Sequence, residues 1–232
     1  PTKALLKSAQ VYDYLKHVDQ YGLKAESIDK DFNAVVSRSR NIANGMSKGV
    51  QFLMKKNKID IIDGFGKVKT GKKVAVTSED GKVKEYSADH IIIATGARSR
   101  ELPNLPQDGE KVIGYRKAMT LASQPSSMIV VGSGAIGVEF AHFYNAMGTK
   151  VTIVEYLPNL VPIEDKDVSK QFERSFKKAG IKVMTNASVE SVDTSGKGIK
   201  ATVKTKKGEE ILEADIVLSA VGIKTNIENI GL

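Results

Sequence analysis

The chain has 232 residues, of which 41% are hydrophobic and 27% charged, with a formal net charge of +8 and no cysteine. This length and composition predict one or two globular domains that bury a sizeable core. Without cysteine the chain can hold no disulfide, thiolate nucleophile or cysteine metal site. Its three histidines show no metal-ligand spacing, so we expect no metal site.

Basic residues outnumber acidic ones by 35 to 27. A clustered excess of lysine would indicate a nucleic-acid surface, because lysines neutralise phosphates. The lysine pairs at 55–56, 72–73 and 177–178 stand where helix ends and turns are expected, so a solvated surface explains them. The sequence has no apolar run of about 18 residues and no signal-peptide pattern at its N-terminus. We therefore expect no nucleic-acid partner, no membrane partner and a cytoplasmic location.

Two helices are predicted in the first quarter of the chain. Residues 4–18 carry an amphipathic pattern, and residues 32–54 carry a longer one. In the second segment an apolar stripe runs along the whole predicted helix, from Phe32 to Met54. We expect both helices to pack their apolar faces on other elements.

From Ile59 onward the pattern changes to short β-type runs separated by turns rich in Gly, Lys and Asp. These runs cover residues 59–63, 73–78, 82–87 and 90–96, with a turn at 79–81. They predict a small antiparallel meander that leads into a buried strand. Residues 101–114, which contain Pro103, Pro106 and Gly109, are predicted to be a linker.

The most informative segment is 128–155, where an apolar run leads into Gly132-x-Gly134-x-x-Gly137, then a helical stretch and a second apolar run. Each glycine has a physical role in a dinucleotide-binding turn: the first permits a tight turn, the second lets backbone approach a pyrophosphate, and the third lets helix and strand pack closely. The phosphates of such a ligand lie at the positive end of the helix.

The second apolar run of this segment ends in Glu155. An acid at this position can accept hydrogen bonds from the ribose diol of adenosine and would repel a phosphate on that ribose. The pattern therefore favours NAD over NADP. An ordinary acid at the end of a strand is the alternative for Glu155, and a glycine turn made for packing is the alternative for the loop.

A helix after the fingerprint is predicted to end at Gly180, and residues 181–184 follow as a strand, which completes a βαβαβ half. A second meander is predicted over residues 188–213. Its ending, at 214–222, repeats the pattern of residues 88–96: Ala-Asp, an apolar strand and a glycine. The repeat predicts two copies of one nucleotide-binding plan, the first incomplete at its front; chance similarity between two buried strands is the alternative.

Four segments of the chain resemble the pyridine nucleotide-disulfide oxidoreductases, and within that family the dihydrolipoyl dehydrogenases. They are PTKALL at 1–6, HIIIATGA at 90–97, VGSGAIGVE at 131–139 and AVGIKTN at 220–226. The resemblance implies an α/β fold with two Rossmann-like FAD/NAD(P)-binding domains and β-meander insertions, the first domain being incomplete. Residues 1–112 would then be a partial FAD-binding domain, and residues 113–232 the NAD-binding domain.

In this family Pro-Thr-Lys or Pro-Ser-Lys directly follows the second cysteine of a redox-active disulfide. We therefore expect a Cys-x4-Cys motif immediately before Pro1, and an interface domain with a His-Glu pair beyond residue 232. The chain itself would hold no catalytic residue and would be inactive alone. It departs from the family at 223–226, where Ile-Lys-Thr-Asn replaces the usual Arg-x-Pro-Asn, and this weakens the assignment to the subfamily more than that to the family.

The activity that the resemblance implies is electron transfer from dihydrolipoamide, through a disulfide and FAD, to NAD+. The implied partner is the dihydrolipoyl group of a 2-oxoacid dehydrogenase or glycine cleavage complex, and the implied assembly of the parent protein is a homodimer. Two alternatives stay open. One is another flavin-dependent disulfide reductase, acting on glutathione, mercuric ion or coenzyme A disulfide; the other is an inactive fragment that only binds NAD.

The NAD-side residues that match family positions are the glycine loop, the start of the following helix, the strand-end acid and two positions further on. They are Gly132, Ser133, Gly134, Ala135, Ile136, Gly137, Val138, Glu139, Glu155, Val189 and Gly222. Gly222 would bring backbone close to the nicotinamide, and the backbone of Val189 would meet adenine, although any apolar strand residue would look the same. Ile136 resembles the residue that covers the flavin face, and packing explains it equally well.

The flavin-side residues that match family positions are Lys3, Gly66, Thr95, Gly96 and Ala97. Gly66 could equally be a simple turn glycine. We further predict that Lys3 and Glu139 form an ion pair beside the flavin N5, because a paired charge survives burial where a single charge does not. The alternative is a solvated lysine and a glutamate that complements its helix dipole.

Overall fold

The computed structural model describes residues 1–232, and these form two compact units. The first unit comprises residues 1–43 and 99–222, and the second comprises residues 44–98 and 223–232. This division differs from the domain boundary predicted near residue 112. That boundary separates an FAD-binding from an NAD-binding domain by resemblance to the family, and it stays a prediction. Each unit is described by itself.

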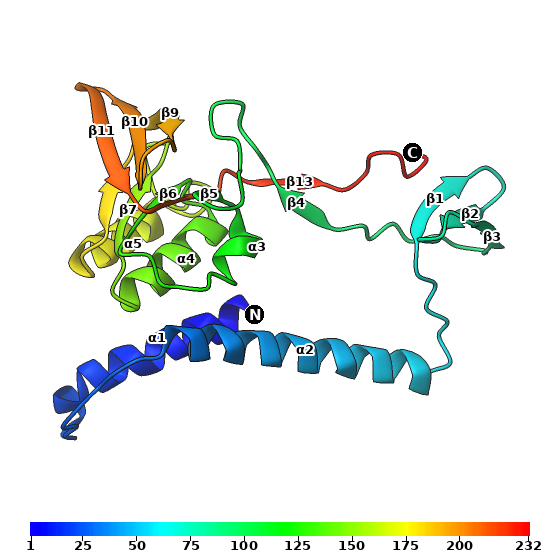
Figure 1. Cartoon of the computed structure of the whole chain (residues 1–232), viewed down its shortest axis with the longest axis horizontal. Helices are drawn as coiled ribbons and strands as arrows, with labels where there is room; N and C mark the ends of the chain where they lie inside the picture. Colours follow the sequence, from blue (N-terminus) through cyan, green and yellow to red (C-terminus); the bar gives the residue numbers. More distant parts are fainter. The chain divides into compact units, whose positions relative to one another are not determined.

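The first unit is built on a five-stranded parallel sheet in the order β5-β12-β6-β7-β8. Strands β5, β6 and β7 of this sheet are labelled in Figure 1. The strands of the sheet are β5 (Val112–Ile113), β6 (Ser127–Val131), β7 (Lys150–Val154), β8 (Lys182–Met184) and β12 (Ile216–Ser219). With α4 (Ala135–Ala146) and α5 (Lys166–Lys178) they form the predicted βαβαβ arrangement, and β12 lies beside β6. The apolar strand predicted near residue 216 is thus confirmed, and the fold is of the predicted α/β class.

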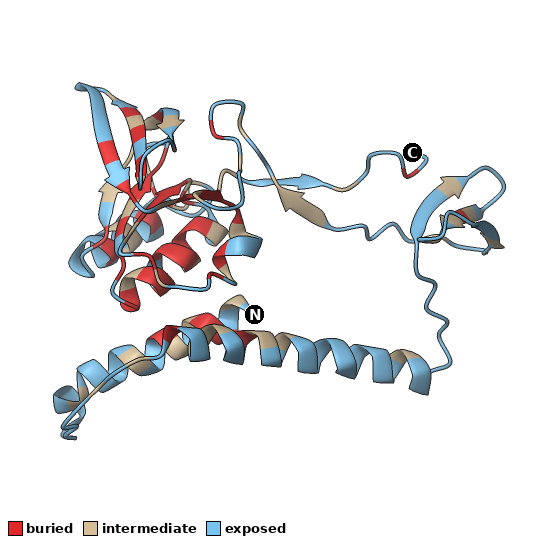
Figure 2. Ribbon diagram, viewed as in Figure 1, coloured by how far each residue is buried: buried red, intermediate tan, exposed pale blue.

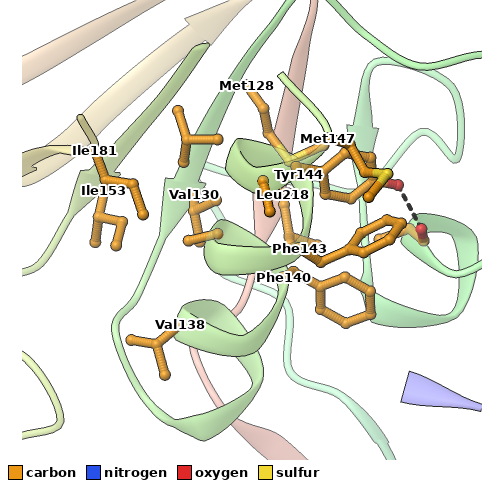
Figure 3. Close-up of a cluster of buried hydrophobic side chains, with 14 of the residues drawn as sticks. Met128, Val130, Val138, Phe140, Phe143, Tyr144, Met147, Ile153, Ile181 and Leu218 are labelled. Atoms are coloured by element: carbon orange, nitrogen blue, oxygen red, sulfur yellow. Dashed lines mark hydrogen bonds between the residues drawn. The ribbon is translucent and has the colours of Figure 1, made fainter. Parts of the chain in front are cut away.

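One face of this sheet is covered by helices. Alternate strand residues such as Val130, Ile153 and Leu218 pack with Phe143 and Tyr144 of α4 in a buried cluster (Figure 3). The hydroxyl of Tyr144 donates a hydrogen bond to the carbonyl of Ala118 at 2.5 Å. The helices that join this cluster besides α4 and α5 are α1 (Thr2–Lys16), the start of α2 (Phe32–Lys56) and α3 (Tyr115–Ala118), and a 3-10 turn (Val18–Tyr21) follows α1.

The opposite face of the sheet packs on a three-stranded antiparallel meander in the order β11-β10-β9. Its strands are β9 (Ser188–Asp193), β10 (Ile199–Thr205) and β11 (Gly208–Ala214). The other set of alternate strand residues, including Ile129, Val131 and Val217, is buried here against Ala201 and Val203 of β10. Because both faces are covered, the buried positions of these parallel strands are mostly apolar, and polar residues such as Lys150 and Lys182 stand at the strand ends.

The segment predicted to be a linker belongs partly to this core. Leu105 has no exposed surface, and Val112 and Ile113 form the edge strand β5, which pairs with β12. The prolines and glycine of the segment indicate a loop, whereas its few apolar residues supply one more strand to the sheet.

The second unit contains a meander of β1 (Phe65–Lys69), β2 (Lys73–Thr77) and β3 (Val83–Ser87). Strands β2 and β3 were predicted, whereas the first strand of the meander lies at 65–69 and not at 59–63. It also contains a two-stranded pair, β4 (Ala97–Ser99) with β13 (Ile223–Thr225), and the part of α2 from Asn44 onward. Figure 2 shows that this unit is mostly exposed, in contrast to the buried sheet and α4 of the first unit.

Two sequence expectations in the second unit were wrong. Residues 59–63 and 90–96 form no strand, and Ile92 is 90% exposed, although a buried strand was predicted there. A parallel strand needs neighbouring strands that share its hydrogen bonds, and no strand of the chain pairs with residues 90–96. The apolar stripe of α2 is likewise buried only near Phe32, while Met46 is 67% exposed.

None of the helices combines the length and apolar character that crossing a membrane would require.

Candidate functional site

The glycine loop joins β6 to α4 at the edge of the sheet where the parallel strands end. Gly132 has a φ of +96°, and a Cβ at this position would lie 2.5 Å from the carbonyl oxygen of Ala220, the residue that follows β12. Only glycine combines this backbone conformation with such a close neighbour. The tight turn predicted at the first glycine is therefore present.

The other two glycines differ in their surroundings. A Cβ at Gly137 would collide with the carbonyl oxygen of Gly132, so glycine here lets the helix pack directly against the turn. A Cβ at Gly134 would meet nothing within 4 Å, and Gly134 is exposed. Packing inside the protein therefore does not require glycine at position 134. The missing side chain leaves open space in front of the backbone.

The N-terminus of α4 has no side-chain cap, because its N-cap residue is Gly134. The contrast with α5 is informative: there Asp165 accepts hydrogen bonds from the amides of Asp167 and Val168. The first amides of any helix lack intrahelical acceptors, and a diphosphate can satisfy them while the helix dipole favours its charge. The exposed and uncapped start of α4 thus fits the phosphates of a dinucleotide.

Glu155 directly follows β7 and is only 6% exposed. Its Oε2 accepts hydrogen bonds from both the backbone amide and the hydroxyl of Ser133, each at 2.7 Å, and its Oε1 accepts from the amide of Leu157 at 2.8 Å. The fold therefore brings the predicted acid and the predicted loop into direct contact. The role of Glu155 on a ribose stays a prediction.

The segment that follows β7 also hydrogen-bonds to the glycine loop, and this contact was not predicted from the sequence. The amide of Val161 donates to the carbonyl of Ser133 at 3.1 Å, and Val161 has a φ of +42°. A β-branched residue rarely adopts positive φ, so no sequence signal pointed to this contact. The hydroxyl of Ser169 on α5 contacts the Val161 carbonyl at 3.3 Å and helps to hold the turn.

Two other predicted NAD-side residues lie in the same unit. Gly222 follows β12 with a φ of +109° and is exposed, and a Cβ at this position would meet nothing within 4 Å, while its carbonyl accepts a hydrogen bond from the Arg100 amide at 3.0 Å. Val189 is buried in β9, and its carbonyl accepts a hydrogen bond from the side chain of Asn104 at 2.6 Å. Asn104, which the sequence did not single out, therefore occupies one of the backbone groups that an adenine contact at Val189 would use.

The predicted ion pair on the helices of the first unit is present. Lys3 Nζ lies 2.8 Å from Glu139 Oε1, and the side chains are 85% and 32% exposed, respectively. Ile136 and Val138 stand on the same helix as Glu139, with Val138 buried and Ile136 partly buried against the helix-covered face. The pair is confirmed as a contact, and its place beside a flavin stays a prediction.

The remaining flavin-side candidates lie in the second unit. Gly96 has a φ of +71°, and Asn226 holds this turn through its side-chain amide on the Thr95 carbonyl at 3.1 Å and its backbone amide on the Gly96 carbonyl at 3.0 Å. Ala97 begins β4, and Gly66 lies in β1. The candidates for flavin contact are therefore divided between the two units, with Lys3 in the first.

Asn226 is itself supported by charges that the sequence did not predict. Arg98 donates to Asn226 Oδ1 at 2.8 Å and to both carboxylate oxygens of Glu228, at 2.6 and 3.1 Å. Lys224 contacts the same carboxylate at 2.8 Å. Hydrogen bonds from Arg98 and then Lys224 hold the pKa of Glu228 far below its ordinary value.

Comparison with known proteins shows which family has this sequence and fold. Residues 1–232 match the family described as pyridine nucleotide-disulphide oxidoreductase. The chain belongs to this family. Curated relatives of this pyridine nucleotide-disulphide oxidoreductase chain include dihydrolipoyl dehydrogenases from Rhizobium etli, 43% identical over 248 residues, and from Bacillus subtilis, 36% identical over 235 residues. A leghemoglobin reductase from Vigna unguiculata is 35% identical over 235 residues.

Solved structures of similar proteins agree. The crystal structure of LpdA from Mycobacterium tuberculosis covers 100% of this family member with a TM-score of 0.90 and 27% identity. The HOCl-induced flavoprotein disulfide reductase RclA from Escherichia coli covers 99% of it with a TM-score of 0.78 and 25% identity.

The chain spans about half the length of the proteins it matches. Each of these alignments covers most or all of this chain but only 52% of the Rhizobium protein, 50% of the Bacillus protein, 45% of the Vigna protein and 50% of LpdA. These matches therefore do not by themselves give this chain the activity of a whole protein of the family.

Proposed function

We propose that this chain carries the NAD-binding domain and part of the FAD-binding domain of a flavoprotein of the dihydrolipoyl dehydrogenase type. The observation that supports it best is the exposed and uncapped start of α4 behind Gly134, with the Glu155 carboxylate beside it. Members of this family use FAD and NAD, and the dehydrogenase relatives in R. etli and B. subtilis share 43% and 36% identity with the chain.

The residues of the first unit bind and orient NAD in this proposal. The amides at the start of α4 hold the diphosphate, and Glu155 accepts hydrogen bonds from the adenosine ribose diol. The charge of Glu155 opposes a phosphate on that ribose, so NADH is preferred over NADPH. Gly222 lets the backbone after β12 approach the nicotinamide, and Val189 remains the weaker candidate for adenine because its carbonyl is already bonded to Asn104.

The flavin side is proposed to use Lys3, Gly66 and the turn from Thr95 to Ala97. The Lys3–Glu139 pair would place the lysine ammonium group near the flavin, and the glutamate carboxylate would balance its charge. When bound, the two cofactors supply the hydride transfer. The contribution of this chain is to place them and to set the charges around them.

For the whole protein we propose dihydrolipoamide as the electron donor, carried by a 2-oxoacid dehydrogenase or glycine cleavage complex, and a homodimer in the cytoplasm. The 232-residue chain contains no cysteine, so we expect it not to oxidise dihydrolipoamide by itself. A second candidate is another flavin-dependent disulfide reductase, because the flavoprotein disulfide reductase RclA matches the chain with a TM-score of 0.78.

The test is a titration of the purified chain with NADH, NADPH and FAD, followed by fluorescence. We expect NADH to bind, and NADPH to bind at least about tenfold more weakly, which corresponds to about 1.4 kcal/mol. Glu155→Ala should weaken NADH binding and remove the preference, because the ribose loses its acceptor. Glu209→Ala, which removes an exposed acid on β11, is the matched control and should change neither. Equal affinity for NADH and NADPH in the unaltered chain would contradict the proposal.

A further inference from the structure

The carboxylate of Glu155 has almost no free capacity to accept hydrogen bonds. A carboxylate offers about four lone-pair positions. Three donors already occupy positions on Glu155: the amide of Ser133, the hydroxyl of Ser133 and the amide of Leu157. About one position is left, on Oε1, whereas a ribose diol brings two hydroxyl donors. A diol that binds through both hydroxyls must therefore displace one of the present donors.

The three donors differ in what they can do when displaced. The amides of Ser133 and Leu157 are fixed in the backbone, and the Ser133 residue is held from its other side by the Val161 amide on its carbonyl. The Ser133 amide is buried, so it would stay unsatisfied and cost free energy if it lost its acceptor, whereas the Leu157 amide belongs to an exposed residue and is bound to the other oxygen, Oε1. The Ser133 hydroxyl, in contrast, rotates freely about one bond and can either donate or accept. Of the two donors on Oε2, the hydroxyl is therefore the one that yields.

We propose that Ser133 is a specificity-determining residue for the adenosine ribose: its hydroxyl holds the Glu155 carboxylate against the glycine loop and competes with the ribose diol for Oε2. The inference rests on the proposed NAD function. Ser133 has no exposed surface and Glu155 is 6% exposed, so the competing contact is inside the protein and is not shared with bulk water. The hydroxyl keeps the acid ordered before the ligand binds and weakens the binding by the strength of one hydrogen bond.

The first test replaces Ser133→Ala and measures the Kd for NADH and NADPH by fluorescence titration. We expect NADH to bind about fivefold more tightly, which is the worth of about one hydrogen bond. NADPH has one ribose hydroxyl blocked by phosphate and needs only one acceptor position, so its Kd should change little. The preference for NADH should consequently rise about fivefold. Ser39→Ala is the matched control, because Ser39 is an equally buried serine whose hydroxyl contacts only the backbone of its own helix α2 and the Arg40 side chain.

The second test combines Ser133→Ala with Glu155→Ala. Without the carboxylate there is no competition, so the Ser133 substitution should leave NADH affinity unchanged in that background. Urea unfolding of the same four proteins should show coupling between the two side chains that does not depend on any ligand.

The possible outcomes separate the two ideas. If the unaltered chain binds NADH but Ser133→Ala weakens it, leaves it unchanged, or strengthens it even when Glu155 is absent, the role of Ser133 is wrong and the NAD site stands. If the unaltered chain binds no NADH at any accessible concentration, the proposed function fails and the role of Ser133 fails with it.

Discussion

Lys3 Nζ on α1 lies 2.8 Å from Glu139 Oε1 on α4, across 136 residues of sequence. Because the lysine side chain is 85% exposed, water and salt screen this pair, and it should contribute less than about 1 kcal/mol to the unfolding free energy. We expect a double-mutant cycle with Lys3→Met and Glu139→Gln, followed by urea denaturation, to give a coupling of that size. A coupling above about 2 kcal/mol would mean that the pair is shielded from water, which would contradict the exposed position of Lys3 in the structure.

The two glycines of the loop should separate folding from binding. Gly137→Ala forces a methyl group against the Gly132 carbonyl and should lower the unfolding free energy by about 1–3 kcal/mol. Gly134→Ala meets no protein atom, so it should cost no more than about 1 kcal/mol through the poorer N-cap. Its methyl group stands where a diphosphate would approach, and NADH binding should fall at least tenfold. Thermal unfolding and NADH titration of both variants check this, and a Gly134→Ala protein that binds normally would place the diphosphate elsewhere.

The buried hydroxyl of Tyr144 should be important for stability. It donates to the Ala118 carbonyl, and the tyrosine has no exposed surface. Tyr144→Phe leaves that carbonyl without its donor and should lower the unfolding free energy by about 1–3 kcal/mol. Phe143→Leu, a change of ring to branched chain in the same cluster, is the comparison for a loss of packing without a lost hydrogen bond.

Tyr144 should also make stability depend on alkaline pH. Burial raises the pKa of its hydroxyl above the ordinary value near 10. Below pH 10 the group is neutral in both folded and unfolded states, so its contribution to stability is fully present. As the pH rises above 10 the unfolded state ionises first, and the contribution is lost progressively. Urea unfolding between pH 8 and about 11 should show this loss in the unaltered chain, with a smaller slope in Tyr144→Phe.

The Arg98–Glu228 contact should keep the carboxylate ionised into acid. Hydrogen bonds from Arg98 and Lys224 lower the pKa of Glu228, so the contact contributes to folding above the ordinary glutamate pKa and is lost as the pH falls through the lowered one. An NMR titration of the Glu228 carboxyl should find it charged well below pH 4. Arg98→Gln should raise the pKa of Glu228, whereas Arg100→Gln, which removes an exposed arginine two residues along the chain from Arg98, should leave it in place. An ordinary pKa in the unaltered chain would show that Glu228 is not held by Arg98.

The sequence predicted best those features that depend on neighbouring residues. The βαβαβ order, the second meander, two strands of the first meander and the end of α5 near Gly180 follow from short-range patterns of apolar residues and glycine, and the structure confirms them. The juxtaposition of the loop with Glu155 was also predictable, because the carboxyl ends of adjacent parallel strands meet at one edge of a sheet.

Features that depend on distant partners were not predictable. Residues 90–96 have the composition of a buried strand, yet they form no strand, because a strand requires a neighbouring strand to pair with along its length. The contacts of Asn104 with β9 and of Val161 with Ser133 join backbone groups whose positions only the folded chain defines.

The sequence by itself determined that the chain has a glycine turn before a helix and an acid after the next strand, because both are written in local spacing. Only the tertiary structure decided that the hydroxyl of Ser133 occupies that acid, since a hydrogen bond between residues 22 positions apart needs the strands β6 and β7 to lie side by side. The residue types set which chemistry is possible, and the packing of the sheet sets which of these groups meet.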